Sequence, residues 1–250
     1  MIASAARSIV RNGWGILLLV IAWETWVIAM QFNSIVMPRP LGVLRDLVIA
    51  PEVYFKNAIY TVSAAVVGLM LGMALGTLLA VLAWLSRLLE GLLTPLTVLF
   101  SSVPVVTIIP ILARLLGYDF GTVLAIVVII CFFPAFVFTT AGLGALPAGA
   151  DDLFRALGAR TGARLFHLAL PAALPHWSVA LRIAAGHAVL GAMVAEYLMG
   201  TAGLGYLFAE TKSDFNMERA FGATLIATIV SVAFFLAALA VERAVKDRWT

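Results

Sequence analysis

The sequence predicts an all-α membrane protein with six transmembrane helices. Of its 250 residues, 63% are hydrophobic and 12% are charged, whereas a soluble domain carries roughly 25% charged residues. The apolar residues fall in runs along the whole chain, and these runs approach the ~20 residues that a membrane-spanning helix requires. We therefore expect a single transmembrane domain over residues 1–250. The net charge of +3 is too small to indicate a nucleic-acid-binding surface.

Six apolar runs are the expected spans, and they cover about residues 14–30, 59–85, 92–116, 120–140, 177–198 and 220–241. The first run is too long for the core of a signal peptide, and no clear small-x-small cleavage site follows it, so we expect it to be retained. Glu24 lies within this run. An acid at that depth usually faces protein or water instead of lipid, so Glu24 either lines a transport path or bonds to a neighbouring helix.

The second span carries three glycines at intervals of four residues, Gly68, Gly72 and Gly76. That spacing places them on one face of a helix, where a second helix can approach closely. The pattern indicates helix packing and not an active site. Before this span, the segment from Leu41 to Val48 is suited to a short helix at the membrane surface.

The third span is interrupted by Pro95, Pro104 and Pro110. Each proline removes a backbone donor and disturbs the helix. Irregular backbone inside a membrane is tolerated only against protein or a water-filled cavity, so this span either lines the path or is a kinked packing helix. The candidate path-lining residues in it are Ser101, Ser102, Thr107 and Arg114. Arg114 either snorkels to the nearer surface or faces a cavity, where it would attract an anionic solute.

The loop 143–176, between the fourth and fifth spans, holds the longest polar interruption in the second half of the chain. Asp151 and Asp152 stand where acidic residues favour the N-terminus of a helix. The residues that follow place three apolar side chains on one helix face. They are Leu153, Phe154 and Leu157.

Gly158 fits the C-terminal stop of this first short helix. A second short helix is expected to follow and to end at Pro171, because proline disturbs a helix interior. This second helix carries Arg160, Arg164 and His167.

The fifth span ends at Glu196, which we expect near the opposite membrane surface as an interfacial acid. The segment from Gly200 to Phe208 is glycine-rich and is expected to form a re-entrant turn or a tight linker. It is not a phosphate-binding loop, because no strand precedes it and no Lys-Ser/Thr follows it.

Several kinds of chemistry find no support in the sequence. The spacing of His167, His176 and His187 matches no common set of metal ligands, and Cys131 is the only cysteine, so no internal disulfide can form. No carboxylate pair or nucleophile–base set indicates a membrane enzyme. The chain also lacks the Gly-x-x-x-x-Gly-Lys-Ser/Thr loop of ATP-hydrolysing proteins. We therefore expect no bound metal or cofactor.

Six spans would put both termini and the loop 143–176 on one side of the membrane. Nine cationic residues outside the spans lie on that side: Arg7, Arg11, Arg87, Arg155, Arg160, Arg164, Arg243, Lys246 and Arg248. Five lie on the other side: Arg39, Arg45, Lys56, Lys212 and Arg219. Positive residues collect in the cytoplasm, so both termini and the loop are expected to be cytoplasmic.

The loop resembles the Glu-Ala-Ala signature of the permease subunits of bacterial ATP-binding-cassette importers. In that signature a glycine stands four residues after the second alanine, and Ile-x-Leu-Pro follows after nine more residues. The matching positions here are Asp152, Leu153, Phe154, Gly158, Leu168, Leu170 and Pro171, continued by Pro175, Leu181 and Arg182. The triplet is degenerate, with an aspartate for the glutamate and bulky side chains for both alanines.

Flanking stretches resemble the sulfonate, nitrate and taurine branch of the same importers, so that the likeness runs from about Trp23 to the end of the chain. They read TWVIAMQFNSIVMPRP, SSVPVVTIIPILARLLG and AEYLMGTAGLGYLF. Arg114 occupies a place that is typically apolar in that branch. The resemblance implies the six-helix fold of type I importer permeases with a cytoplasmic coupling helix.

The resemblance also implies that the first loop helix docks in a groove on a cytosolic ATPase. The coupling residues would be Asp152, Leu153, Phe154, Arg155, Leu157, Gly158 and Pro171. The alternative is that the apolar residues of this helix pack on the permease's own spans.

The implied assembly lies in the bacterial inner membrane, surrounded by lipid. Two permease copies would form the path, two cytosolic ATP-binding subunits would carry ATP and Mg²⁺, and a periplasmic or lipid-anchored protein would deliver the solute. The resemblance favours a small anion such as a sulfonate, taurine or nitrate, with a pyrimidine vitamin precursor as the alternative. A rival is an ion-coupled secondary transporter that uses Glu24 and Glu196, although no inverted repeat supports it.

Overall fold

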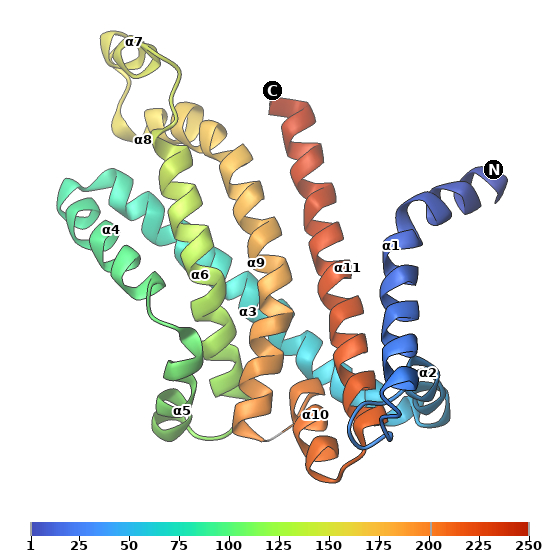
Figure 1. Ribbon diagram of the computed structural model, residues 1–250. Helices are drawn as coiled ribbons and strands as arrows, with labels where there is room; N and C mark the ends of the chain where they lie inside the picture. Colours follow the sequence, from blue (N-terminus) through green and yellow to red (C-terminus); the bar gives the residue numbers. More distant parts are fainter. Residues whose placement is uncertain (1, 201, 250) are drawn as a thin grey trace.

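Helices make up every regular element that the structure describes. The structure is a computed structural model that describes residues 2–200 and 202–249, with side chains within 14–97, 99, 102–200 and 202–248. Among the described residues, four helices are long and apolar enough to cross a membrane: α3 (Pro51–Leu85), α6 (Phe120–Gly144), the continuous helix Thr161–Met199 that contains α9 (Leu170–Met199), and α11 (Met217–Trp249). In Figure 1, α6, α9 and α11 lie side by side and α3 crosses obliquely behind them.

The centre of the bundle is the packing of α3 against α6 and of both against α9. Gly72 and Gly76 lie where α3 meets α6, and an added Cβ would fall 2.6 Å from the Cβ atoms of Cys131 and Ala135, respectively. Gly68 meets Val127 in the same row. The three glycines therefore let two helix backbones approach closely, which is how small residues act at interfaces inside membranes.

The helix α1 (Ile2–Ala29) stands beside the bundle and not within it (Figure 1). It is apolar from Trp14 to Ala29 but shorter over that stretch than the four long spans. Its described apolar side chains are mostly exposed. Trp23 packs against Phe221 of α11, with ring centroids 5.6 Å apart.

The third expected span is two helices, α4 (Arg87–Ser101) and α5 (Val105–Leu116). The interruption expected in the span over 92–116 lies at residues 102–104. Of its three prolines, only Pro104 coincides with the break, and a proline disfavours the helical conformation at the residue before it. Pro95 and Pro110 lie inside α4 and α5. The Thr107 hydroxyl donates to the carbonyl of Pro104 over 2.7 Å.

The loop between α6 and α9 contains two short helices, α7 (Ala150–Ala156) and α8 (Thr161–Arg164). Gly158 separates them with a φ of +72°. Contrary to expectation, the second helix does not end at Pro171. It continues through a wide π-helical turn, η1 (Leu165–Ala169), directly into α9. Wide turns and prolines are both recognised sites of helix distortion, and here the turn lies immediately before the proline, so the helix passes residue 171 unbroken. The expected loop 143–176 therefore becomes helical from residue 161.

The two ends of the bundle carry different short elements. The helices α2 (Pro40–Ile49), α5 and α10 (Leu204–Ser213) lie at one end, whereas α7, α8 and both chain termini lie toward the other (Figure 1). Within the glycine-rich segment 200–208, which was expected to be a turn or a tight linker, residues 204–208 form the first part of α10. Thr201 lies outside the described residues. The side chains of Arg7 and Arg11 also lie outside them.

Candidate coupling segment and path-lining residues

The helix α7 presents apolar side chains away from the bundle. It lies at the tip of the molecule in Figure 1. Leu153 is 58% exposed and Leu157 is 75% exposed, while Phe154 is partly buried and Asp152 is exposed. These leucines do not cover the chain's own spans, so they are accessible to another protein.

The position of α7 is fixed by Asp151, which the sequence indicated only as a helix-start residue. Arg164 of α8 donates from Nε to Asp151 Oδ1 over 2.7 Å. Arg155 pairs with Oδ2 of the same carboxylate at 2.9 Å, one helical turn later. The guanidinium of Arg164 also lies over the ring of Trp84, 5.9 Å from its centroid. This one carboxylate therefore ties α7 to α8 and, through Arg164, to the end of α3.

The predicted path-lining residues of α4 and α5 lie at the helix break and beyond it. Ser102 and Thr107 are exposed, and Arg114 is exposed in the last turn of α5. The side chain of Ser101 lies outside the described residues. The break at Pro104 thus brings Ser102 and Thr107 near one another along the chain, with Arg114 two turns further.

Glu24 is not brought together with these residues within one chain. It lies on α1, across the bundle from α5 (Figure 1). Its carboxylate is half-buried and lies 4.0 Å from a guanidinium nitrogen of Arg39, which precedes α2. This contact links α1 to the segment before α2.

The prediction that Glu196 is an interfacial acid is wrong. Its side chain is completely buried between α3, α9 and α10. The hydroxyl of Thr61 donates to Glu196 Oε2 over 2.8 Å. This contact could not be predicted, because Thr61 is 135 residues away and nothing in its local pattern marks it as a partner.

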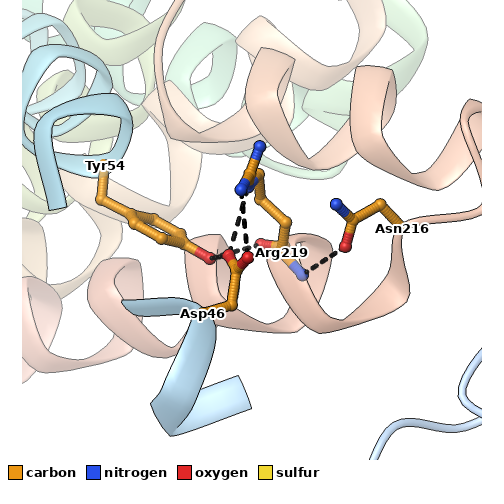
Figure 2. A network of polar contacts seen from close by, with 4 residues as sticks. All are labelled: Asp46, Tyr54, Asn216 and Arg219. Carbon is orange, nitrogen blue, oxygen red and sulfur yellow. Dashed lines mark hydrogen bonds and ion pairs between the residues drawn. The ribbon is translucent and has the colours of Figure 1, made fainter. Parts of the chain in front are cut away.

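A second polar cluster at the same end joins α2, α3 and α11 (Figure 2). Arg219 binds both carboxylate oxygens of Asp46, from Nε over 3.1 Å and from Nη2 over 3.0 Å. Tyr54 donates to Asp46 Oδ2 over 2.5 Å, and Asn216 caps the N–H of Arg219 over 3.1 Å. Burial raises the pKa of Asp46, but the bonds from Arg219 and Tyr54 outweigh burial and hold that pKa below its usual value.

An apolar groove of about 910 Å³ lies between the second half of α3 and the first half of α9. Its lining includes Met70, Met73, Phe166 and Trp177. The indole of Trp177 donates to the hydroxyl of Thr77 over 2.9 Å, which satisfies the polar atom of an otherwise apolar wall.

Comparison with known proteins decides the class of this bundle. Residues 57–250 match the family model described as "Binding-protein-dependent transport system inner membrane component". The chain belongs to this family. Its relatives include the formylaminopyrimidine transport permease of Halalkalibacterium halodurans, 30% identical over 88% of each chain. They also include a putative aliphatic sulfonates transport permease of Bacillus subtilis, 25% identical over 88% of this chain and 82% of that one.

Solved structures show the same fold. A methionine ABC transporter in an inward-facing conformation aligns with a TM-score of 0.62 at 19% identity, over 84% of this chain and 98% of that one. An amino acid ABC transporter aligns with a TM-score of 0.65 at 15% identity, over 81% of this chain and 97% of that one. The predicted all-α fold of type I importer permeases is therefore confirmed.

The permease is a multi-pass component of the inner membrane and belongs to an ABC importer. It is a transport subunit and not an enzyme, since ATP hydrolysis in such systems is carried out by a separate subunit. This class excludes the ion-coupled secondary transporter that Glu24 and Glu196 would have served. Importers of this class work with an ATPase and with a solute-binding protein.

Proposed function

We propose that two copies of the permease form the path for a small organic or inorganic anion, and that α7 couples this path to the ATPase. ATP and Mg²⁺ would be bound by two cytosolic ATPase subunits. A periplasmic or lipid-anchored binding protein would deliver the solute to the end that carries α2, α5 and α10. Closure of the ATPases would move both α7 helices and switch the path from inward-open to outward-open.

This proposal rests on the exposed apolar side chains of α7 and on the contacts of Asp151 with Arg164 and Arg155 that hold α7 in place. A helix with projecting leucines fits a groove on a partner, and buried apolar area stabilises such contacts. The contacts of Asp151 with Arg164 and Arg155, here called the brace, make the helix suitable for transmitting a rigid-body displacement. Asp152, Arg155, Gly158 and Pro171 would position this helix, and Leu153, Phe154 and Leu157 would enter the groove.

The proposed sidedness places α7 and both termini in the cytoplasm. This sidedness is supported by the excess of cationic residues in the segments that would share a side with α7, because positive residues collect on the cytoplasmic side. The four long helices, the apolar stretch Trp14–Ala29, and α4 and α5 taken together as one broken span would make the six expected spans.

The proposal that the solute is an anion rests on Arg114. A guanidinium near the path would bind a sulfonate, carboxylate or nitrate through charge-assisted hydrogen bonds. Relatives named for sulfonates, nitrate and taurine agree with an anion. The alternative is a pyrimidine, which is supported by the 30% identity to the formylaminopyrimidine permease over 88% of each chain.

The test substitutes Phe154→Asp and Leu157→Asp on α7, with Leu88→Asp as the matched control. Leu88 is 82% exposed at the start of α4, outside the coupling segment. We expect both α7 variants to lose co-purification with the ATPase and ATP-driven uptake, and the control to keep both. Intact co-purification and uptake in the α7 variants would reject the docking role.

A further inference from the structure

The N-terminus of α10 is capped by side chains from two other helices. A helix leaves its first N–H groups without partners inside the helix. Here Asn57 Oδ1 accepts from Gly203 N–H over 3.1 Å, Thr61 Oγ1 accepts from Leu204 N–H over 2.8 Å, and Glu196 Oε2 accepts from Gly205 N–H over 3.0 Å. Three consecutive amides at the start of α10, beginning with its N-cap Gly203, are thus bound by side chains of α3 and α9.

Glu196 is the central acceptor of this cap. Its side chain is completely buried, and Oε2 accepts from Gly205 and also from the hydroxyl of Thr61. Within the described part of the chain, Oε1 has no hydrogen-bond partner and no cationic side chain forms an ion pair with this carboxyl group. A carboxyl group in such a place is costly unless something compensates it. The positive end of the α10 dipole supplies that compensation.

The local sequence leaves room for this arrangement. Gly203 has a φ of +98°, a conformation that side-chain-bearing residues rarely adopt, and an added Cβ would overlap the carboxyl group of Glu196. An added Cβ at Gly205 would overlap the carbonyl oxygen of Met193. The two glycines therefore allow the start of α10 to approach the last turns of α9.

Glu196 also stands at the far end of the helix that begins beside the coupling segment. Residues Thr161–Met199 form one continuous helix, which starts at α8 next to α7 and ends beside α10 (Figure 1). A displacement of α7 therefore has an unbroken route along α9 to the cap. At its other side, α10 buries Leu204 and Leu207 in a core shared with Tyr54 and Ala223.

We propose that Glu196 is a positioning residue that fixes α10 to α3 and α9, so that α10 moves with α9 and keeps its end of the path closed until α7 is displaced. The gating part rests on the proposed coupling through α7. The capping part depends only on the contacts around Glu196.

The experiment compares Glu196→Ala with Glu196→Gln in the complete importer in lipid nanodiscs and proteoliposomes. The control is Glu210→Ala on α10, because the bond that Glu210 accepts from Tyr206 is exposed to solvent. Amide hydrogen exchange at Leu204 and Gly205 reports on the cap, and ATP hydrolysis without binding protein reports on gating. We expect Glu196→Ala to speed the exchange about tenfold or more, because a buried donor loses its acceptor, and to raise basal ATP hydrolysis several-fold.

The conservative variant separates positioning from general damage. Glu196→Gln keeps an acceptor oxygen for Thr61 and Gly205, so it should restore slow exchange and low basal hydrolysis, and Glu210→Ala should alter neither. Unchanged exchange in Glu196→Ala would overturn the cap, and faster exchange with unchanged basal hydrolysis would overturn the gating role. Should Glu196→Ala fail to assemble, Thr61→Val removes the hydroxyl at nearly constant volume and should speed exchange at Leu204. A failure of α7 coupling would appear separately, as intact ATP-driven uptake in Phe154→Asp and Leu157→Asp with the exchange at Leu204 and Gly205 unchanged.

Discussion

Arg164 and Asp151 hold the coupling segment in place, since Nε of the arginine donates to Oδ1 of the aspartate over 2.7 Å. Both side chains are largely shielded from solvent, whereas the second partner of the aspartate, Arg155, is mostly exposed. The difference matters because exposed ion pairs contribute little to stability, while hydrogen bonds to a partly buried charge contribute about 1.5–3 kcal/mol.

The first prediction concerns this brace. Arg164→Gln should loosen α7 and lower the solute transported per ATP by several-fold, because the displacement of α7 would no longer reach α8 and α9 intact. Arg155→Gln is the matched comparison, since it removes a bond to the same carboxylate that is exposed and therefore contributes less to the position of α7. It should change coupling by less than about twofold. Uptake and ATP hydrolysis measured together in proteoliposomes provide the ratio, and equal effects of the two variants would contradict the brace.

The second prediction concerns the solute. Arg114→Ala should raise the KM for an anionic solute by about tenfold or more, because a charge-assisted hydrogen bond is lost, without lowering basal ATP hydrolysis. Arg45→Ala, which removes an exposed cation from α2 at the same end, is the control and should leave the KM unchanged. Uptake of taurine, nitrate and formylaminopyrimidine distinguishes the solute classes. An unchanged KM for every transported solute would reject a role for Arg114.

The third prediction follows from the low pKa of Asp46, which the bonds from Arg219 and Tyr54 maintain against burial. Because the pKa is lower in the folded state, the stabilisation is fully present above the usual value of 3.8 and is lost as the pH falls through the lower folded value. Asp46→Asn should destabilise the permease by about 1.5–3 kcal/mol at pH 7. Thermal unfolding in detergent should show this difference shrinking below pH 3.8, and a difference that stays constant in acid would contradict the prediction.

The fourth prediction concerns helix packing. Gly72→Ala should destabilise the bundle by about 1–3 kcal/mol, because the added methyl group would overpack the contact with Cys131 and Val128 on α6. Gly91→Ala is the matched control, because nothing lies within 4 Å of an added Cβ there. It should stabilise α4 by about 0.5–1 kcal/mol, as alanine is the better helix former. Thermal unfolding of both variants measures the contrast, and similar stabilities would count against the close approach.

The sequence was most informative where a local pattern has a direct physical consequence. Apolar runs of the length of a membrane predicted the helices, and the four-residue glycine spacing pointed to the face on which α3 now meets α6. The acidic start and the glycine stop of α7 were likewise predictable, because they depend on neighbouring residues.

The failures occurred where distant residues decide the outcome. Pro171 looked like a helix end, yet a wide turn at Leu165–Ala169 carries the helix past it. Glu196 looked interfacial, yet its partners are Thr61 and the start of α10. Neither the wide turn nor the cap has a local signature, since each depends on how helices pack in space.

The most direct test of coupling through α7 is site-specific cross-linking from position 157. Cys131 is the only cysteine and is completely buried, so Leu157→Cys provides a single exposed thiol for a photo-reactive cross-linker. Leu88→Cys, also highly exposed, is the control. In the assembled importer we expect position 157 to cross-link to the ATPase and position 88 not to do so, and the cross-linked complex to stop transporting. Cross-links from position 157 only to the permease itself or to lipid would contradict coupling through α7.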